Sequence, residues 1–258
     1  GVGGKRGFFE ISAIACPRYA GPVNIGVHFM ATPFRIVFAL YPRVTQLDFT
    51  GPYEVLARMP GAEVIVASTD GGELASEMGL SFARLTRLSD IAACDMIFVP
   101  GGPGQTDAML DTRFMAEVTR LGRSARYVAA ACTGSLILGA AGLLKGKRAG
   151  SHWAYRELLA AFGAVPDSAR VVHDGGAFTG GGVTAGIDIA LRIVADIAGA
   201  GTAKEIELML EYAPEPPFGC GRPESAEPAT VAAVRERFAA FAAERRSAIE
   251  RLTGGANA

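Results

Sequence analysis

An α/β fold with a mostly parallel sheet is the architecture that this sequence predicts. Short apolar runs rich in β-branched and aromatic residues alternate with segments of helical character, and short connections join them. The loops after three of these runs hold polar or small residues, as expected where strands end at a ligand-binding edge. Half of the 258 residues are hydrophobic and the net charge is only −1, which describes a globular chain able to bury a large core.

The first part of the predicted core runs strand, helix, strand, strand. Residues 35–41 form a β-rich apolar run that Pro42 ends. A helix is expected over residues 51–59, because its Gly-Pro start places a proline in the first turn. Residues 63–68 and 95–99 are two further strands, closed by the glycine-rich runs Asp-Gly-Gly and Pro-Gly-Gly-Pro-Gly.

The second part continues the alternation. A helix is expected over residues 107–122, a strand over 127–131 and a helix over 134–144. Residues 171–179 predict a β-hairpin, because Asp-Gly is a favoured pair for its two-residue turn. A long helix follows over residues 184–197. Strands and helices in this order imply a parallel sheet covered on both faces.

Composition divides the chain into three segments. Residues 1–33 lack a clean periodicity and are expected to be an N-terminal extension outside the core, with Met30 as the candidate natural start. Residues 34–213 form the α/β domain. Residues 214–258 hold a proline-rich connector and a charged helix over 229–252. Apolar residues recur on that helix at helical spacing: Val231, Val234, Phe238, Phe241 and Ile249. We expect this helix to pack on the domain or on a partner subunit, with no catalytic part.

Cys132 stands at the corner between a predicted strand and the following helix. Free N–H groups and the dipole at a helix start favour a thiolate, which is a competent nucleophile at neutral pH. The alternative is an inert buried cysteine that acts as a small hydrophobe. Because a core cysteine has no need of a strand end beside small residues, we interpret Cys132 as reactive.

Three strand-end loops should meet at the carboxyl edge of the sheet. They contain, in chain order, Asp48, Gly101 with Gly102, and Cys132 with Thr133. Asp48 either caps the next helix or hydrogen-bonds the Cys132 sulfur and holds a water. The glycine pair is either a plain tight turn or a set of backbone donors for negative charge that develops on a substrate.

Composition argues against several other classes. The balanced charge gives no basic surface for nucleic acid, and no run reaches the roughly eighteen apolar residues that a membrane helix needs. Four cysteines without paired spacing are typical of a reducing cytoplasm. Three histidines without ligand spacing predict no metal site. One of them, His152, is either a satisfied structural histidine or a group that the fold brings near the site.

Several segments together resemble the ThiJ/PfpI superfamily, a cysteine-dependent branch related to class I glutamine amidotransferase domains, and within it the isonitrile (isocyanide) hydratases. The resemblance covers about residues 35–228. It is carried by residues 46–52 (QLDFTGP), 99–102 (VPGG), 131–136 (ACTGSL), 152–153 (HW), 179–182 (TGGG), 185–188 (AGID) and 210–214 (LEYAP). The Cys-Thr-Gly and His-Trp segments are shared with related transcription regulators.

This resemblance implies a flavodoxin-like three-layer sandwich, a homodimer and an enzyme without a cofactor. The implied reaction is hydration of an isocyanide to an N-substituted formamide through a covalent thioimidate. By the same resemblance, Cys132 matches the nucleophile, Asp48 its acidic partner and Thr133 the residue beside the nucleophile. Gly101 and Gly102 match glycines whose backbone lines the site.

Other functions compete with this one. A protease or amidase would carry a histidine beside the cysteine, where this chain has Thr133. A glyoxalase or deglycase shares the cysteine and the acid, but it usually has glutamate as the acid and a histidine near the thiol. A redox sensor would use an accessible cysteine that oxidises readily. A ligand-sensing domain of a regulator normally carries a DNA-binding region of roughly a hundred residues, and only thirty residues follow Pro228.

Overall fold

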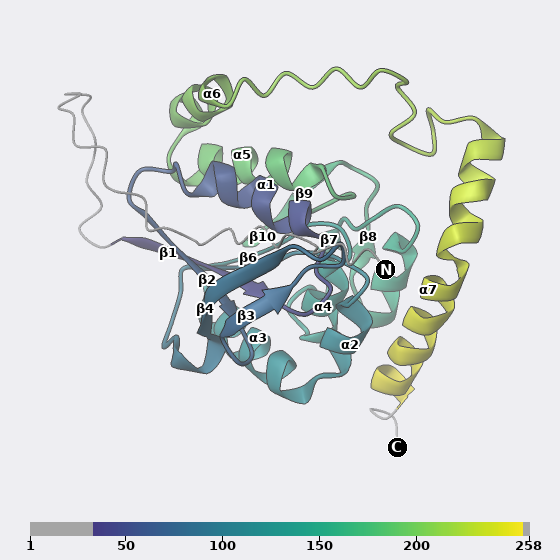
Figure 1. Ribbon diagram of the computed structural model, residues 1–258, viewed down its shortest axis with the longest axis horizontal. Helices are drawn as coiled ribbons and strands as arrows, with labels where there is room; N and C mark the ends of the chain where they lie inside the picture. The colour runs from purple at the N-terminus through teal and green to yellow at the C-terminus, as the bar shows by residue number, and fades with distance from the viewer. Residues whose placement is uncertain (1–32, 255–258) are drawn as a thin grey trace, which may run out of the picture.

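The computed structural model describes residues 33–254 as an eight-stranded main sheet with helices on both faces (Figure 1). The main-sheet strands are β1 Phe34–Leu40, β2 Ala62–Ser68, β3 Gly72–Ala75, β4 Ser81–Arg87, β5 Met96–Val99, β6 Tyr127–Ala130, β9 Val171–Asp174 and β10 Ala177–Gly180. Their order is β3-β4-β2-β1-β5-β6-β10-β9, and the two outermost strands run antiparallel to their neighbours. The six strands between them are parallel, which confirms the predicted architecture.

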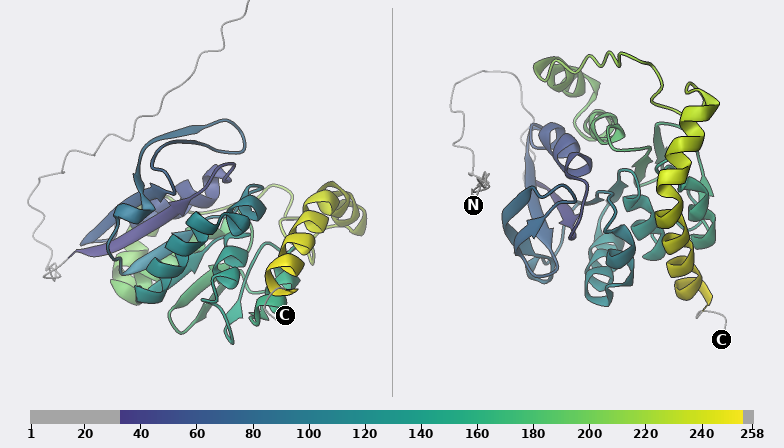
Figure 2. Two further views of the ribbon diagram at one scale, coloured as in Figure 1. Left: turned by 90° about the horizontal axis from the view of Figure 1, so that it is seen from below. Right: turned by 45° about the vertical axis from the view of Figure 1, so that its right-hand side comes forward.

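Helices form the outer two layers of the sandwich. They are α1 Gln46–Leu56, α2 Gln105–Leu110, α3 Thr112–Ser124, α4 Gly134–Ala140, α5 Ala185–Ile197, α6 Ala200–Met209 and α7 Pro228–Gly254. Helices α1 and α5 pack together on one face, with α6 against α5, while α2, α3 and α4 cover the other face (Figures 1 and 2). Two short 3₁₀ helices (Leu88–Asp90 and Arg156–Phe162) and a small two-stranded sheet (β7 Arg148–Ala149, β8 Val165–Pro166) complete the described chain.

The core lies along the central strands, which are buried on both faces. Strands β5 and β6 are buried almost throughout, as expected for parallel strands under two helical layers. The Phe38 ring of β1 lies 4.9 Å from the Phe98 ring of β5 and 5.3 Å from the Phe49 ring of α1. These contacts fix α1 over the carboxyl end of β1, where the candidate site forms.

The predicted start of the first helix is wrong. The helix begins at Gln46, so Asp48 lies in its first turn and not in a loop before it. Pro52 lies inside the helix, where it removes one backbone hydrogen bond. Close packing compensates for that loss, because a Cβ on Gly186 of α5 would lie only 2.9 Å from the Pro52 ring.

Other predicted elements differ in extent. The helix expected over 107–122 is two helices, because the Asp111 carboxylate accepts hydrogen bonds from the N–H groups of Arg113 and Phe114 and caps a new start. The helix expected over 134–144 ends at Ala140. The β3–β4 hairpin and α6 were not predicted, while the hairpin over 171–179 and the helix over 184–197 are confirmed. The expectation for residues 1–33 falls almost wholly outside the described residues.

The C-terminal helix α7 packs against the body of the domain. A connector rises from α6 and arches across the domain to α7, which lies along one side (Figures 1 and 2). Helix α7 contacts α2 and the 3₁₀ helix Arg156–Phe162. Within residues 33–254, no helix combines the length and apolar character needed to span a bilayer.

The order of strands reverses beside β1. The chain leaves β1 for β2 on one side and later returns to β5 on the other side. Parallel sheets open a crevice at such a reversal, outside the carboxyl ends of the strands. The loops after β1, β5 and β6 meet at this place.

Candidate active site

Cys132 occupies a strained corner between β6 and α4. Its φ angle is +54°, a left-handed conformation that non-glycine residues adopt at a cost. The backbone holds it there, because the Cys132 N–H donates to the Gly181 carbonyl at 2.8 Å. The hydroxyls of Ser135 and Ser151 both donate to the Cys132 carbonyl, at 3.0 and 2.9 Å. The corner places Cys132, which is buried, at the carboxyl edge of the sheet.

Asp48 reaches the same place from α1 and is completely buried. The capping interpretation of Asp48 is wrong, because the cap position is Thr45 and no hydrogen bond of good geometry reaches either Asp48 carboxylate oxygen. The Asp48 carboxylate shares a proton with the Cys132 thiol, which opposes the effect of burial on the Asp48 pKa. Helix α1 therefore holds a buried acid directly against the cysteine.

Gly101 provides the space in which the acid and the thiol meet. A Cβ placed on Gly101 would lie 2.7 Å from the Cys132 Cβ, 2.7 Å from the Thr133 nitrogen and 3.0 Å from Asp48 Oδ2. Non-bonded atoms in a packed core do not tolerate contacts this short without a shift of the surrounding structure. Glycine is therefore required at position 101 by the close approach of the Cys132–Thr133 corner and the Asp48 side chain.

Thr133 and Gly102 bind each other. The Gly102 N–H donates to Thr133 Oγ1 at 3.1 Å, and Gly102 adopts a φ of +149° that favours glycine. The Gly102 N–H is therefore engaged and is not a free donor for substrate charge. The Thr133 backbone N–H faces the Cys132 sulfur instead, where it favours the charged form and lowers the cysteine pKa.

The expectation of a free thiolate at neutral pH is wrong for the resting site. Burial raises the pKa of Cys132 well above its ordinary value, and the adjacent Asp48 charge raises it further. Burial also raises the pKa of Asp48 to about 7, although the Cys132 thiol opposes that shift. Helix α4 has only seven residues, and its start does not outweigh these effects. The pair therefore retains a proton near neutral pH.

His152 lies beside the site but not on the sulfur. Its ring centre lies 5.6, 5.5 and 5.4 Å from those of Trp153, Tyr155 and Phe238, and its Nδ1 accepts a hydrogen bond from the Ala154 N–H at 3.2 Å. Burial lowers the His152 pKa to about 4, so the ring is neutral near pH 7. A neutral ring in an aromatic cluster fits the structural interpretation.

Arg245 of α7 is only 3% exposed and was not predicted as a site residue. Its guanidinium hydrogen-bonds Gln105 and approaches the Gly102 carbonyl, and its charge lowers the pKa of Cys132. A signal was present in the sequence. Arg245 falls on the apolar stripe of its helix, four residues after Phe241 and four before Ile249.

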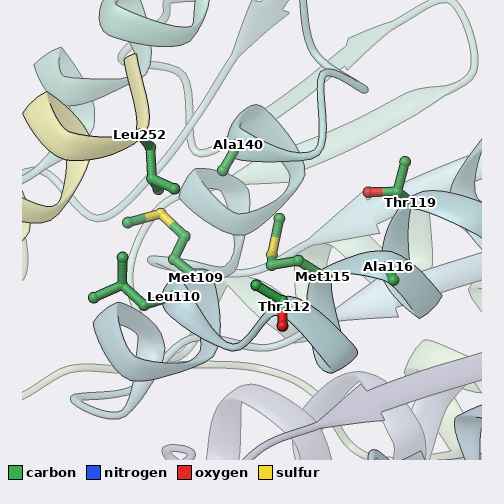
Figure 3. Close-up of a pocket in the computed structure, with 8 residues that line it drawn as sticks. All are labelled: Met109, Leu110, Thr112, Met115, Ala116, Thr119, Ala140 and Leu252. Atoms are coloured by element: carbon green, nitrogen blue, oxygen red, sulfur yellow. The ribbon is translucent and has the colours of Figure 1, made fainter. Parts of the chain in front are cut away.

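Two hollows involve the C-terminal part of the chain, one at the end of α7 and the other at the connector before it. One is an apolar hollow among α2, α3, α4 and the end of α7, and no ionisable side chain lines it (Figure 3). The other lies between the connector and the loop that contains Ser151, and it also contacts Gly181 and Gly182. The second hollow adjoins the backbone that holds Cys132, whereas the first has no group able to take part in the chemistry.

Gly101→Ala is expected to lower the midpoint of thermal unfolding by several degrees and to remove most activity. The added methyl group overpacks the contact among Cys132, Thr133 and Asp48 and costs about 1–3 kcal/mol. Calorimetry and alkylation of the Cys132 thiol measure the two effects. Gly201→Ala is the matched control, because nothing lies within 4 Å of a Cβ on Gly201 and its helix should be unaffected or stabilised. Equal behaviour of the two variants would show that the contact at Gly101 is not tight.

The fold and the site together define a class: a three-layer α/β protein with a strained cysteine and a buried carboxylate at the carboxyl edge of a parallel sheet. Residues 34–196 match the sequence pattern of the DJ-1/PfpI family. This chain belongs to the DJ-1/PfpI family, which confirms the resemblance and the flavodoxin-like fold that it implied.

Individual proteins of known name or structure are also similar to this chain. The chain is 48% identical over 205 residues to an isonitrile hydratase of Pseudomonas putida, covering 80% of this chain and 90% of that protein. It superimposes with a TM-score of 0.84 on a ThiJ/PfpI family protein from Pseudomonas syringae, at 35% identity over 93% of this chain and 99% of that one. It is 29% identical over 171 residues to the HTH-type transcriptional regulator GlxA of Rhizobium meliloti, covering 66% of this chain and 53% of the regulator.

Proposed function

We propose that this protein is an enzyme that hydrates isocyanides to N-substituted formamides, with Cys132 as the nucleophile and Asp48 as the proton-transfer group. The observation that carries the proposal is the buried carboxylate of Asp48 against the Cys132 thiol, with no other hydrogen-bond partner among residues 33–254. The similarity to an isonitrile hydratase over 80% of the chain supports the substrate class.

The first step forms the covalent intermediate. The Asp48 carboxylate takes the proton of the Cys132 thiol and delivers it to the lone pair of the terminal isocyanide carbon. The sulfur adds to that carbon, and one electron pair of the carbon–nitrogen triple bond moves to nitrogen. The product is a thioimidate, Cys–S–CH=N–R, and Asp48 is a carboxylate again. An acid with a pKa of about 7 suits this double role, because it can both accept and release a proton near neutral pH.

The second step hydrolyses the thioimidate. Asp48 takes a proton from a water molecule whose oxygen adds to the same carbon, and that proton passes to the nitrogen. The tetrahedral adduct then forms its carbonyl, the carbon–sulfur bond breaks, and the hydroxyl proton returns to the sulfur through Asp48. The Thr133 side chain is fixed by Gly102 and its backbone N–H faces the sulfur, so this residue can stabilise the departing thiolate.

The competing functions receive less support from the geometry. A redox sensor needs a readily ionised thiol, whereas burial and Asp48 raise the pKa of Cys132. A glyoxalase or deglycase with a histidine at the thiol does not fit a neutral His152 held among aromatic rings. The similarity to the regulator GlxA covers only 53% of that protein and leaves the enzyme proposal in place.

Turnover of a simple aromatic isocyanide, followed by ultraviolet absorbance, tests the proposal. We expect the wild-type protein to form the N-aryl formamide, with one equivalent of water consumed and no added cofactor. Rapid quenching and mass spectrometry should find the thioimidate mass on the peptide that contains Cys132. Folded protein that leaves the isocyanide unchanged would contradict the proposal, and methylglyoxal and peroxide would then be the next substrates to test.

We also propose that the protein is a homodimer, as the family resemblance implies. Large apolar side chains on α6 and the connector are exposed in the single chain: Leu208 at 82%, Met209 at 68% and Phe218 at 87%. Single molecules rarely leave such residues uncovered together. Light scattering coupled to gel filtration measures the mass, and a monomer at all concentrations would contradict the proposal.

A further inference from the structure

The C-terminal helix inserts one buried cation into the candidate active site. Arg245 Nε donates to the Gln105 side-chain oxygen at 2.8 Å, and Nη2 lies 3.4 Å from the Gly102 carbonyl oxygen. The guanidinium carbon lies 4.1 Å from the centre of the Tyr155 ring. Arg245 thus contacts two segments of the site, the turn at Gly102 and the segment after β7 that contains Tyr155.

The charge of Arg245 is not neutralised by a carboxylate at contact. Within residues 33–254, no Asp or Glu lies at salt-bridge distance from Arg245, and its partners are a neutral amide and a carbonyl. Its Nη1 is buried and has no hydrogen-bond partner. Burying an unpaired charge is costly, and proteins keep such charges mainly where they act on another group.

The groups around Arg245 identify what it acts on. Tyr41 at the end of β1, His152 and Tyr155 face the cation as neutral groups, because burial raises the tyrosine pKa values and lowers that of His152. The remaining titratable groups of the site are Asp48 and Cys132, together with Glu77, which is exposed on the loop between β3 and β4 and interacts with Asp48. Negative charge inside the site is therefore carried by Asp48 and Cys132.

We propose that Arg245 is a positioning residue for Cys132, supplying a fixed positive charge that stabilises the negative charge on the sulfur when the proton moves to Asp48. This role rests on the proposed function, because both steps pass negative charge between Asp48 and the sulfur. The hydrogen bond to the Gly102 carbonyl also holds the turn that fixes Thr133. Helix α7 is therefore part of the active site, contrary to the expectation that it has no part in catalysis.

The test compares a charged and a neutral replacement. In Arg245→Lys the positive charge is kept, and in Arg245→Gln it is removed, while both lose the shape of the guanidinium. The measurement is the rate of Cys132 alkylation by iodoacetamide as a function of pH, located by mass spectrometry. Arg245→Gln should move the midpoint of this profile upward by about one pH unit and slow alkylation near pH 7 about tenfold. Arg245→Lys should stay close to the wild type.

Two controls separate this role from a structural one. Arg246→Gln removes a neighbouring exposed charge of the same helix and should leave the profile unchanged. The single tryptophan, Trp153, lies 5.8 Å from the Arg235 guanidinium of α7, so its fluorescence reports whether the helix is docked. Because the lysine and glutamine variants share any loss of shape, a change of docking common to both does not affect their comparison.

The outcomes are distinct. Identical alkylation profiles for Arg245→Lys and Arg245→Gln would overturn the proposal, whether both match the wild type or both are displaced. The proposal is supported if the alkylation profile moves to higher pH in Arg245→Gln and stays at the wild-type position in Arg245→Lys. Alkylation needs no isocyanide, so the charge effect is measurable even if turnover of isocyanides fails. With turnover, we expect kcat to fall about tenfold in Arg245→Gln near pH 7 with little change in KM, and to recover as the pH rises.

Discussion

Cys132→Ala is expected to lower kcat/KM for isocyanide hydration by at least about 10⁴-fold, because the change removes the atom that bonds to the substrate carbon. Cys132→Ser should be nearly as inactive. A hydroxyl is a far weaker acid than a thiol, and Asp48 with a pKa of about 7 is too weak a base to activate it. Both variants should keep the wild-type circular dichroism spectrum and unfold cooperatively, since the surrounding hydrogen bonds use the Cys132 backbone.

The other described cysteines are the matched controls. Cys220→Ala changes an exposed thiol and Cys94→Ala a buried one, and neither residue lies at the carboxyl edge that holds Asp48. Both variants should keep wild-type turnover. A large loss in either, or turnover retained in Cys132→Ala, would refute the assignment of the nucleophile.

Asp48→Asn is expected to lower kcat by about 10²–10⁴-fold, because an amide cannot take the proton from sulfur and deliver it to carbon. The pH dependence gives a second signature. The reactive form has Asp48 ionised, so wild-type kcat/KM should rise with pH and level off above about 7. Asp48→Asn should lose this rise, whatever its residual rate.

The same substitution should stabilise the protein at alkaline pH. Burial raises the pKa of Asp48 from 3.8 to about 7, so the folded state binds more protons than the unfolded state between these values. The stability of the wild type therefore falls as pH rises through this window, by about 4 kcal/mol in total. Asparagine is uncharged and pays no such cost, so the difference in unfolding midpoint should be largest near pH 8 and small below about pH 4.

Glu77→Gln is the matched control for Asp48→Asn. Glu77 is exposed, accepts a hydrogen bond from the Thr45 hydroxyl at 2.7 Å and raises the pKa of Asp48 by its charge. The variant should keep a high rate and move the rise of kcat/KM to slightly lower pH. Unchanged turnover in Asp48→Asn would reduce Asp48 to a structural residue and remove the basis of the proton-transfer scheme.

Local pattern predicted the central strands and the cysteine corner. Apolar runs of strand length are visible in a sequence when both faces of a sheet are buried, as they are in β5 and β6. The start of α1 was not predicted, because Pro52 is tolerated inside the helix only through its contact with Gly186 of α5. The break before α3 depends on a side-chain cap at Asp111, which competes with helical periodicity.

The sequence by itself determined the parallel α/β architecture and the residues that meet at its carboxyl edge: Asp48, Gly101, Gly102, Cys132 and Thr133. Only the tertiary structure decided the protonation of the pair, because the pKa of a buried thiol depends on solvent exclusion and on charges from distant segments. The tertiary structure also decided that α7 contributes a residue to the site, since Arg245 hydrogen-bonds Gln105, a residue 140 positions earlier. Periodicity records which side of a helix is buried, whereas the partners that bury it are set by packing over the whole chain.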